Sequence, residues 1–154
     1  MPKPNYLNAT IANISSTVAS YKPVTYFFTV TPMQSIPQGG YLQVWMPRSV
    51  RLPLGVNQIN CTIGRGTQKF YEYATPYSLE PLRFDLKNFV KEGPSPAGTS
   101  FTLQCDGIWN PRALTNTESI ELSTRDLDNC AIELADRNLK VDMTELPSFE
   151  SVII

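Results

Sequence analysis

The 154-residue sequence contains no histidine. Histidine is the commonest general base, a frequent metal ligand and the usual partner of a serine or cysteine nucleophile, so its absence argues against these kinds of catalytic site. Charged residues are also scarce at 18%, and the 13 basic residues nearly balance the 14 acidic ones. No basic stripe could neutralise phosphates. We therefore expect neither an enzyme nor a nucleic-acid-binding protein.

Long apolar runs are absent too. No segment approaches the roughly 20 apolar residues that a membrane-spanning helix needs, so we expect no span in this chain. The N-terminus, Met1-Pro2-Lys3-Pro4-Asn5-Tyr6, is not a signal peptide because no apolar segment follows the lysine. If the protein is secreted, the chain is then a mature fragment of something longer.

Short segments in which apolar and polar residues alternate are abundant. The apolar members of the clearest runs are Val24, Tyr26, Phe28, Val30; Leu42, Val44, Met46; Ile59, Cys61, Ile63; Leu82, Phe84, Leu86; Phe101, Leu103, Cys105; Ile120, Leu122; and Leu139, Val141, Met143. Looser runs contain Ala12, Ile14, Val18 and Ile132, Leu134. A period of two is typical of strands with one buried face. We predict an all-β fold, an Ig-like antiparallel β-sandwich of about eight or nine strands.

Proline and glycine separate these runs and favour turns between them. The segment 85–90 is the one stretch that could form a helix, but its β-branched and aromatic neighbours favour a strand. By length, residues 1–146 form one domain. Residues 147–154 form a C-terminal strand or a linker to a next copy.

Three ordered groups of residues carry a family resemblance. The first reads YFFTVTP at 26–32 and IPQGGYLQVWMP at 36–47, the second LKNF at 86–89 and AGT at 97–99, and the third GIWNP at 107–111 and TESIELST at 117–124. Together they resemble the tandemly repeated Ig-like modules of ciliate and protist cell-surface and secreted proteins. Met46 departs from the pattern, which usually has an aromatic residue there. The resemblance implies an extracellular structural or adhesive role, further copies in the parent chain and no catalytic residue.

Three N-glycosylation sequons occur, beginning at Asn8, Asn13 and Asn60. Asn13 and Asn60 lie on the polar phase of their runs, where a glycan could project into water, and Asn8 lies in the leading segment. The alternative is that all three are ordinary surface amides. Secretion would favour glycosylation.

The three cysteines are Cys61, Cys105 and Cys130, and all fall on the apolar phase of their runs. In a secreted sandwich they predict one disulfide and a leftover thiol. Three pairings are open. The alternative is three buried free thiols.

No metal or cofactor site is expected. Asp126-Leu127-Asp128-Asn129 is similar to the start of a calcium loop but lacks the glycine and the distal acidic residue of an EF-hand, so an Asx-rich turn is the better interpretation.

Several large apolar side chains fall where water is expected. Phe27, Tyr41 and Trp45 take the polar phase of two consecutive runs, which predicts an exposed aromatic interface unless a loop such as 71–73 covers them. The tail adds the apolar residues Phe149, Val152, Ile153 and Ile154, which either return to the domain's own sheet or add a strand to a neighbouring subunit.

Two functions remain open. The first is a glycosylated repeat unit of a surface coat or fibre, joined head to tail to further copies of itself by strand addition from segments 7–18 or 147–154. The second is a carbohydrate-binding or adhesive module that uses the exposed aromatic side chains.

Overall fold

The computed structural model describes residues 5–16, 23–48, 50–53, 55–79, 81–111, 119–135, 139 and 143. The described residues form ten strands and one short 3₁₀ turn, so the expected all-β fold is confirmed with more strands than predicted. The elements are β1 (Asn5–Ile14), β2 (Val24–Thr31), β3 (Tyr41–Trp45), β4 (Ile59–Arg65), β5 (Gln68–Ala74), β6 (Ser78–Leu79), β7 (Leu82–Leu86), η1 (Asn88–Val90), β8 (Phe101–Ile108), β9 (Glu121–Arg125) and β10 (Ala131–Ala135).

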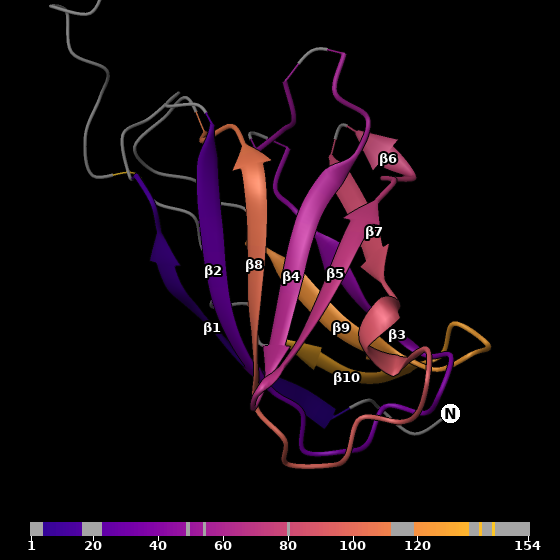
Figure 1. The fold of residues 1–154 in the computed structure, drawn as a ribbon. Coiled ribbons are helices and arrows are strands. Elements are labelled where there is room, and N and C mark those ends of the chain that lie inside the picture. Colours follow the sequence, from indigo (N-terminus) through magenta and orange to yellow (C-terminus); the bar gives the residue numbers. More distant parts are fainter. Residues whose placement is uncertain are drawn as a thin grey trace, which may run out of the picture.

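The strands form one continuous curled sheet in the order β5-β4-β8-β2-β1-β10-β9-β3-β7-β6. The sheet turns at β1, whose residues Asn8–Ile14 pair with β2 while Asn5–Leu7 pair with β10. We call β1–β2–β8–β4–β5 the first layer and β10–β9–β3–β7–β6 the second layer. In Figure 1 the second layer lies behind the first, with β9 and β10 running obliquely to β2 and β8.

This sandwich-like arrangement corrects two expectations. The pairing of β1 with β10 is parallel, so the sheet is not wholly antiparallel. In addition, the segment 7–18 was a candidate donor strand, but its first eight residues belong to β1, which is paired within its own sheet. Donating β1 to another subunit would remove the strand that joins the two layers.

The core lies between the layers because each central strand turns one apolar face inward. In β2 every second side chain is buried, β7 follows the same rule, and β8 follows it from Phe101 to Cys105. The largest fully buried side chains include Tyr26, Phe28, Phe84, Phe89 and Phe101. Burying a side chain of this size contributes roughly 1.5–3 kcal/mol before the entropy of ordering the chain is subtracted. Leu139 and Met143 are also buried, as their alternation predicts, although the intervening residues lie outside the described part.

In β10 the predicted inward face was wrong. Glu133 is completely buried, whereas Leu134 is 39% exposed. The pairing of β10 with β9 is irregular between Ala131 and Glu133, which breaks the simple alternation of faces. The buried carboxylate has a structural role, because it accepts the backbone N–H groups of Met33 at 3.2 Å and Gln34 at 2.8 Å.

The predictions also missed β5 and misassigned the end of β7. Segment 71–73 was an alternative candidate for a loop that covers the aromatic side chains, but it lies in β5, an edge strand that is partly exposed on both faces and so lacks a clear apolar alternation. The predicted strand at 85–90 ends at Leu86 and gives way to η1. The Glu72 carboxylate accepts the N–H groups of Lys87 at 2.7 Å and Asn88 at 2.9 Å, which fastens the first layer to the start of η1.

The turn before β3 needs its two glycines. Gly39 has a φ of 81°, which favours glycine, and a Cβ on Gly40 would lie 2.5 Å from the carbonyl oxygen of Arg125. This close approach lets β3 enter the sheet beside β9. Among the described residues, no helix is long and apolar enough to span a membrane.

Candidate functional site on the second layer

The predicted aromatic interface does not exist as a single patch. Phe27 lies on β2 in the first layer, whereas Tyr41 and Trp45 lie on β3 in the second layer, so the two groups project from opposite sides of the molecule. Strands that are consecutive in the chain are not neighbours in this sheet. Tyr41 is also only 8% exposed, which removes it from the expected exposed set.

Tyr41 and Trp45 are held by neighbours on the second layer. The Tyr41 hydroxyl donates to Oδ1 of Asn129, and the ammonium of Lys87 lies 5.4 Å from the ring centroid. The Trp45 indole N–H donates to the hydroxyl of Tyr77 at 2.5 Å. The Arg83 guanidinium carbon lies 3.9 Å from the Trp45 ring centroid, a cation–π contact that covers part of the indole.

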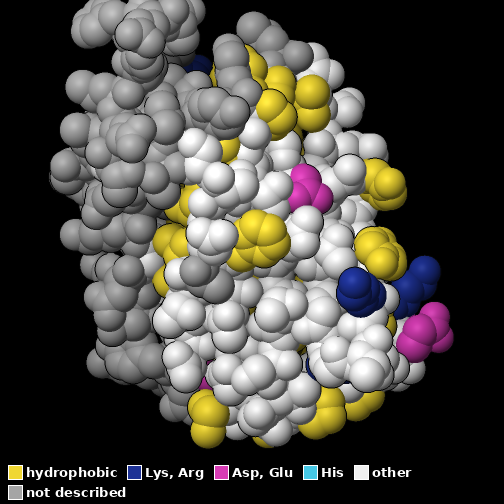
Figure 2. Space-filling model, turned by 60° about the vertical axis from the view of Figure 1, so that its left-hand side comes forward, with side chains coloured by type: hydrophobic (Ala, Val, Ile, Leu, Met, Phe, Trp, Pro, Cys, Tyr) yellow, Lys and Arg dark blue, Asp and Glu magenta, His cyan; other side chains and the backbone are white. Residues whose placement is uncertain are grey.

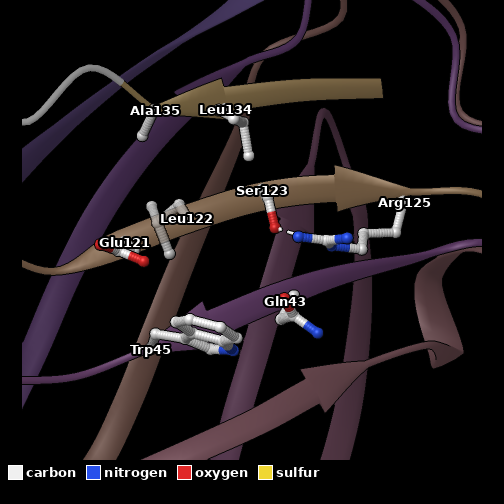
Figure 3. A pocket seen from close by; sticks show the side chains of 8 residues that line it. All are labelled: Gln43, Trp45, Glu121, Leu122, Ser123, Arg125, Leu134 and Ala135. Carbon is white, nitrogen blue, oxygen red and sulfur yellow. Dashed lines mark hydrogen bonds between the residues drawn. The ribbon is translucent and has the colours of Figure 1, made fainter. Parts of the chain in front are cut away.

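Beside the indole lies a hollow of about 190 Å³, which we call the Trp45 hollow. Figure 3 shows the side chains that line it from three adjacent strands. They are Gln43 and Trp45 from β3, Glu121, Leu122, Ser123 and Arg125 from β9, and Leu134 and Ala135 from β10. The volume is below the 300–1,000 Å³ typical of enclosed small-molecule pockets, so the hollow suits one ring or side chain of a longer ligand.

Strand register explains how these residues meet. Directly opposite residues of neighbouring strands share a face, and the register aligns Leu134 with Ser123 and Ser123 with Gln43. It also aligns Glu121 with Trp45 and Trp45 with Arg83. Two rows of side chains therefore cross the outer face of the second layer, and each combines polar residues with one apolar residue, Leu134 in the first row and Trp45 in the second.

Hydrogen bonds position the cationic side of the hollow. The Arg125 guanidinium donates to the Ser123 hydroxyl at 3.2 Å, which Figure 3 marks, and to the backbone carbonyl of Asn129 at 3.0 Å. Glu121 on the far side is exposed. A ligand on this face therefore meets a cation at one end and a carboxylate at the other.

Asp85 lies on the same face, opposite Gln43 in the register. Partial burial raises the pKa of the Asp85 carboxyl, while a hydrogen bond from Gln43 and the nearby Lys87 and Arg125 act in the opposite direction. Oδ1 of Asp85 and Nε of Arg83 are shielded from solvent and have no hydrogen-bond partner among the residues that the structure describes. One acceptor and one donor that could bind a ligand thus lie beside the hollow.

The arrangement suits recognition of a ligand through a partly covered aromatic ring with polar groups around it. Within the described part of the chain, no group of three or more His, Cys, Asp or Glu side chains could hold a metal ion. Sequence reasoning selected Trp45 by its phase but missed Gln43, Arg83 and Arg125, because polar residues on a polar face give no distinguishing signal.

The outer face of the first layer has a different character. The register places Asn13 opposite Phe27 and Asn60 opposite both Asp106 and Tyr73. All three sequon asparagines, Asn8, Asn13 and Asn60, are exposed, and they share this face. Figure 2, viewed from the β1–β2 side, shows scattered hydrophobic side chains and few charged ones. The largest exposed aromatic residues here are Tyr71 and Tyr73, at 64% and 68%.

The remaining candidates are distributed over the molecule. Cys61 and Cys105 are buried on the adjacent strands β4 and β8, whereas Cys130 is half-buried before β10. The tail residues Phe149, Val152, Ile153 and Ile154, with all of 147–154, lie outside the described residues.

No family model matches the chain, and no curated protein matches it. Among solved structures, AvmM, which catalyses macrocyclization in alchivemycin A biosynthesis, is 12% identical over 94% of this chain and 92% of its own, with a TM-score of 0.47. The collagen-binding domain of Erysipelothrix rhusiopathiae surface protein RspB is 14% identical over 95% of this chain and 46% of its own, with a TM-score of 0.40. A collagen-binding domain from a Staphylococcus aureus adhesin is 8% identical over 94% of each chain, with a TM-score of 0.38. At these scores the likenesses define neither a family nor a ligand.

Proposed function

We propose that this chain is an extracellular, Ig-like adhesive module that binds carbohydrate on the outer face of its second layer and catalyses no reaction. The observation that carries the proposal is the Trp45 hollow, where an indole lies among amide, carboxylate and guanidinium groups. A sugar ring has an apolar face that can stack on an aromatic ring and a rim of hydroxyls that needs donors and acceptors. Gln43, Glu121 and Arg125 supply both kinds of group.

The test is calorimetric titration with soluble oligosaccharides, including β-glucan, chitin, mannan and sulfated fragments. We expect one class to bind, and Trp45→Ala to weaken that binding roughly tenfold or more, as loss of an aromatic anchor does. Trp45→Phe keeps a ring in place and should retain part of the affinity. Tyr73→Ala is the matched control, because it removes an exposed aromatic residue from the opposite layer. Binding that Tyr73→Ala abolishes and Trp45→Ala leaves intact would overturn the assignment.

A second function, a glycosylated repeat of a coat or fibre that assembles head to tail, is favoured by the edge position of β5. Within the described part of the chain β5 pairs only with β4, so its other side is a template for an added strand. The Tyr71 carbonyl points to that side, where it accepts the Asn88 side-chain amide at 2.7 Å, a bond that an added strand would replace. The Tyr71 N–H points the same way, as both groups of a strand residue do.

Tyr71→Pro tests this second function because it removes an outward donor without breaking the bonds between β4 and β5. We expect electron microscopy of the unaltered protein to show filaments, which Tyr71→Pro and a deletion of residues 148–154 each shorten or abolish. Tyr71→Val, which keeps the N–H, is the control. Filaments that persist in both altered proteins would contradict assembly by strand addition at β5.

A further inference from the structure

Two of the three cysteines face one another across neighbouring strands. β4 and β8 are antiparallel, and their register places Cys61 directly opposite Cys105. Both side chains point into the core, with exposures of 3% and 0%. Their sulfur atoms are 3.3 Å apart.

The backbone at this position suits a covalent bond between the two sulfurs. Directly opposed residues of an antiparallel pair have Cα atoms about 4.5–5.5 Å apart, and disulfides occur at Cα separations of about 4.4–6.8 Å. Small side-chain rotations therefore suffice to bring the sulfurs to bonding distance, and the ladder between β4 and β8 need not move.

Cys130 is differently placed. It lies in the turn between β9 and β10 of the second layer, and its thiol contacts the backbone carbonyl of Asp128 at 3.9 Å. Its backbone N–H donates to the Asp126 carboxylate at 3.0 Å, which fixes it in that turn. Cys130 therefore lies in the second layer, whereas the pair in β4 and β8 lies in the first layer.

We infer that Cys61 and Cys105 form a disulfide that staples β4 to β8, and that Cys130 stays a thiol. The pair loses two protons and two electrons. The oxidant is a small or protein disulfide, such as oxidised glutathione: one thiolate attacks it to give a mixed disulfide, and the second thiolate then displaces the bound thiol. The oxidant leaves as two thiols. The persistence of this bond rests on the proposed extracellular location, since disulfides persist in oxidising compartments.

Burial dictates when the bond forms. Burial raises the pKa of the Cys61 thiol, and the hydrogen bond with Cys105 raises it further. The folded protein therefore holds little of the reactive thiolate. The exchange therefore belongs to folding, before the ladder between β4 and β8 closes over the sulfurs. Once the bond has formed, the same burial means that external thiols reduce it only when the ladder between β4 and β8 opens.

Refolding in a glutathione redox buffer tests the pairing directly. The unaltered protein and Cys130→Ser are refolded, then unfolded without reductant in an alkylating reagent and examined by peptide mass spectrometry. We expect alkylation of Cys130 alone in the first protein and no alkylation in the second, with a linked peptide containing both Cys61 and Cys105. A linkage that includes Cys130, or alkylation of all cysteines, would overturn the inference.

Thermal unfolding supplies an independent measurement. Reductant should lower the Tm of Cys130→Ser but leave the Tm of the Cys61→Ala/Cys105→Ala double variant unchanged. An equal effect of reductant on both proteins would contradict the staple. If the bond forms on refolding but the protein isolated from its source is reduced, the pairing stands and the extracellular location fails, so the two proposals fail separately.

Discussion

At the scale of single residues, buried polar groups join segments that are far apart in the chain. Tyr26 is fully buried, and its hydroxyl donates to Oδ1 of Asn110 at 2.8 Å. The Asn110 amide donates in turn to the backbone carbonyl of Ser16 at 2.7 Å, which ties the segment after β1 to the end of β8. Burial raises the pKa of the Tyr26 hydroxyl, so it remains a donor throughout the usual pH range.

Glu133 gives the clearest prediction at this scale. Glu133→Gln replaces one carboxylate oxygen by an amide that faces a backbone donor, at either Met33 or Gln34. We expect the free energy of unfolding to fall by about 1–3 kcal/mol, since a buried donor loses its acceptor. Urea denaturation measures it. Glu121→Gln, on an exposed site, should change stability by less than about 0.5 kcal/mol. Equal losses in the two variants would contradict this role for Glu133.

Asp85 predicts a pH dependence of stability. Its pKa in the folded protein is raised above the ordinary 3.8, chiefly by burial, so the folded state binds the proton more tightly than the unfolded state does. Stability therefore falls as pH rises from about 3.8 through the raised pKa. Asp85→Asn removes this loss. The unfolding free energy of the unaltered protein relative to Asp85→Asn should decrease over that window, and an increase would contradict the prediction.

At the scale of elements, sequence patterns were reliable for most central strands but failed at the edge strand β5 and in the central strand β10. The runs of β2, β7 and β8 were found because one face of each strand packs against the opposite layer while the other face meets water, so apolar and polar residues alternate. The edge strand β5 is partly wet on both faces and carries no such pattern. The inward turn of Glu133 was missed for a related reason, because an irregular register is set by the partner strand.

The contact between β5 and η1 gives a prediction about an element. Glu72→Ala removes the acceptor of the Lys87 and Asn88 N–H groups, and should lower stability by about 0.5–2 kcal/mol, as loss of a capping side chain does. Hydrogen exchange of these two amides should accelerate accordingly. Lys69→Ala, an exposed site on the same strand, should leave their exchange unchanged. Unaltered exchange in Glu72→Ala would show that the contact does not hold the layers together.

At the scale of the whole molecule, the two outer faces differ. The first layer presents the sequon asparagines Asn8, Asn13 and Asn60, whereas the second layer presents the Trp45 hollow. Glycans on one face would leave the other open, so a glycosylated surface module could still bind a ligand.

The separation of faces can be measured. Protein expressed with N-glycans and the same protein after enzymatic deglycosylation should bind the oligosaccharide identified by calorimetry with the same affinity within about twofold, since the glycans project from the opposite layer. Intact-mass analysis reports which sites are occupied, and Asn60→Gln serves as the single-site control. An affinity that rises strongly on deglycosylation would show that glycans reach the hollow.

The sequence by itself determined the all-β class, the buried face of most central strands, though not that of β10, and the turns between strands. These follow from alternation and from proline and glycine, which act locally along the chain. Tertiary structure alone decided which strands became neighbours. It separated Phe27 from Trp45, brought Cys61 opposite Cys105 and gathered Gln43, Trp45 and Arg125 on one face. The physical reason is that strand pairing joins segments far apart in the sequence, and no local pattern records the partner.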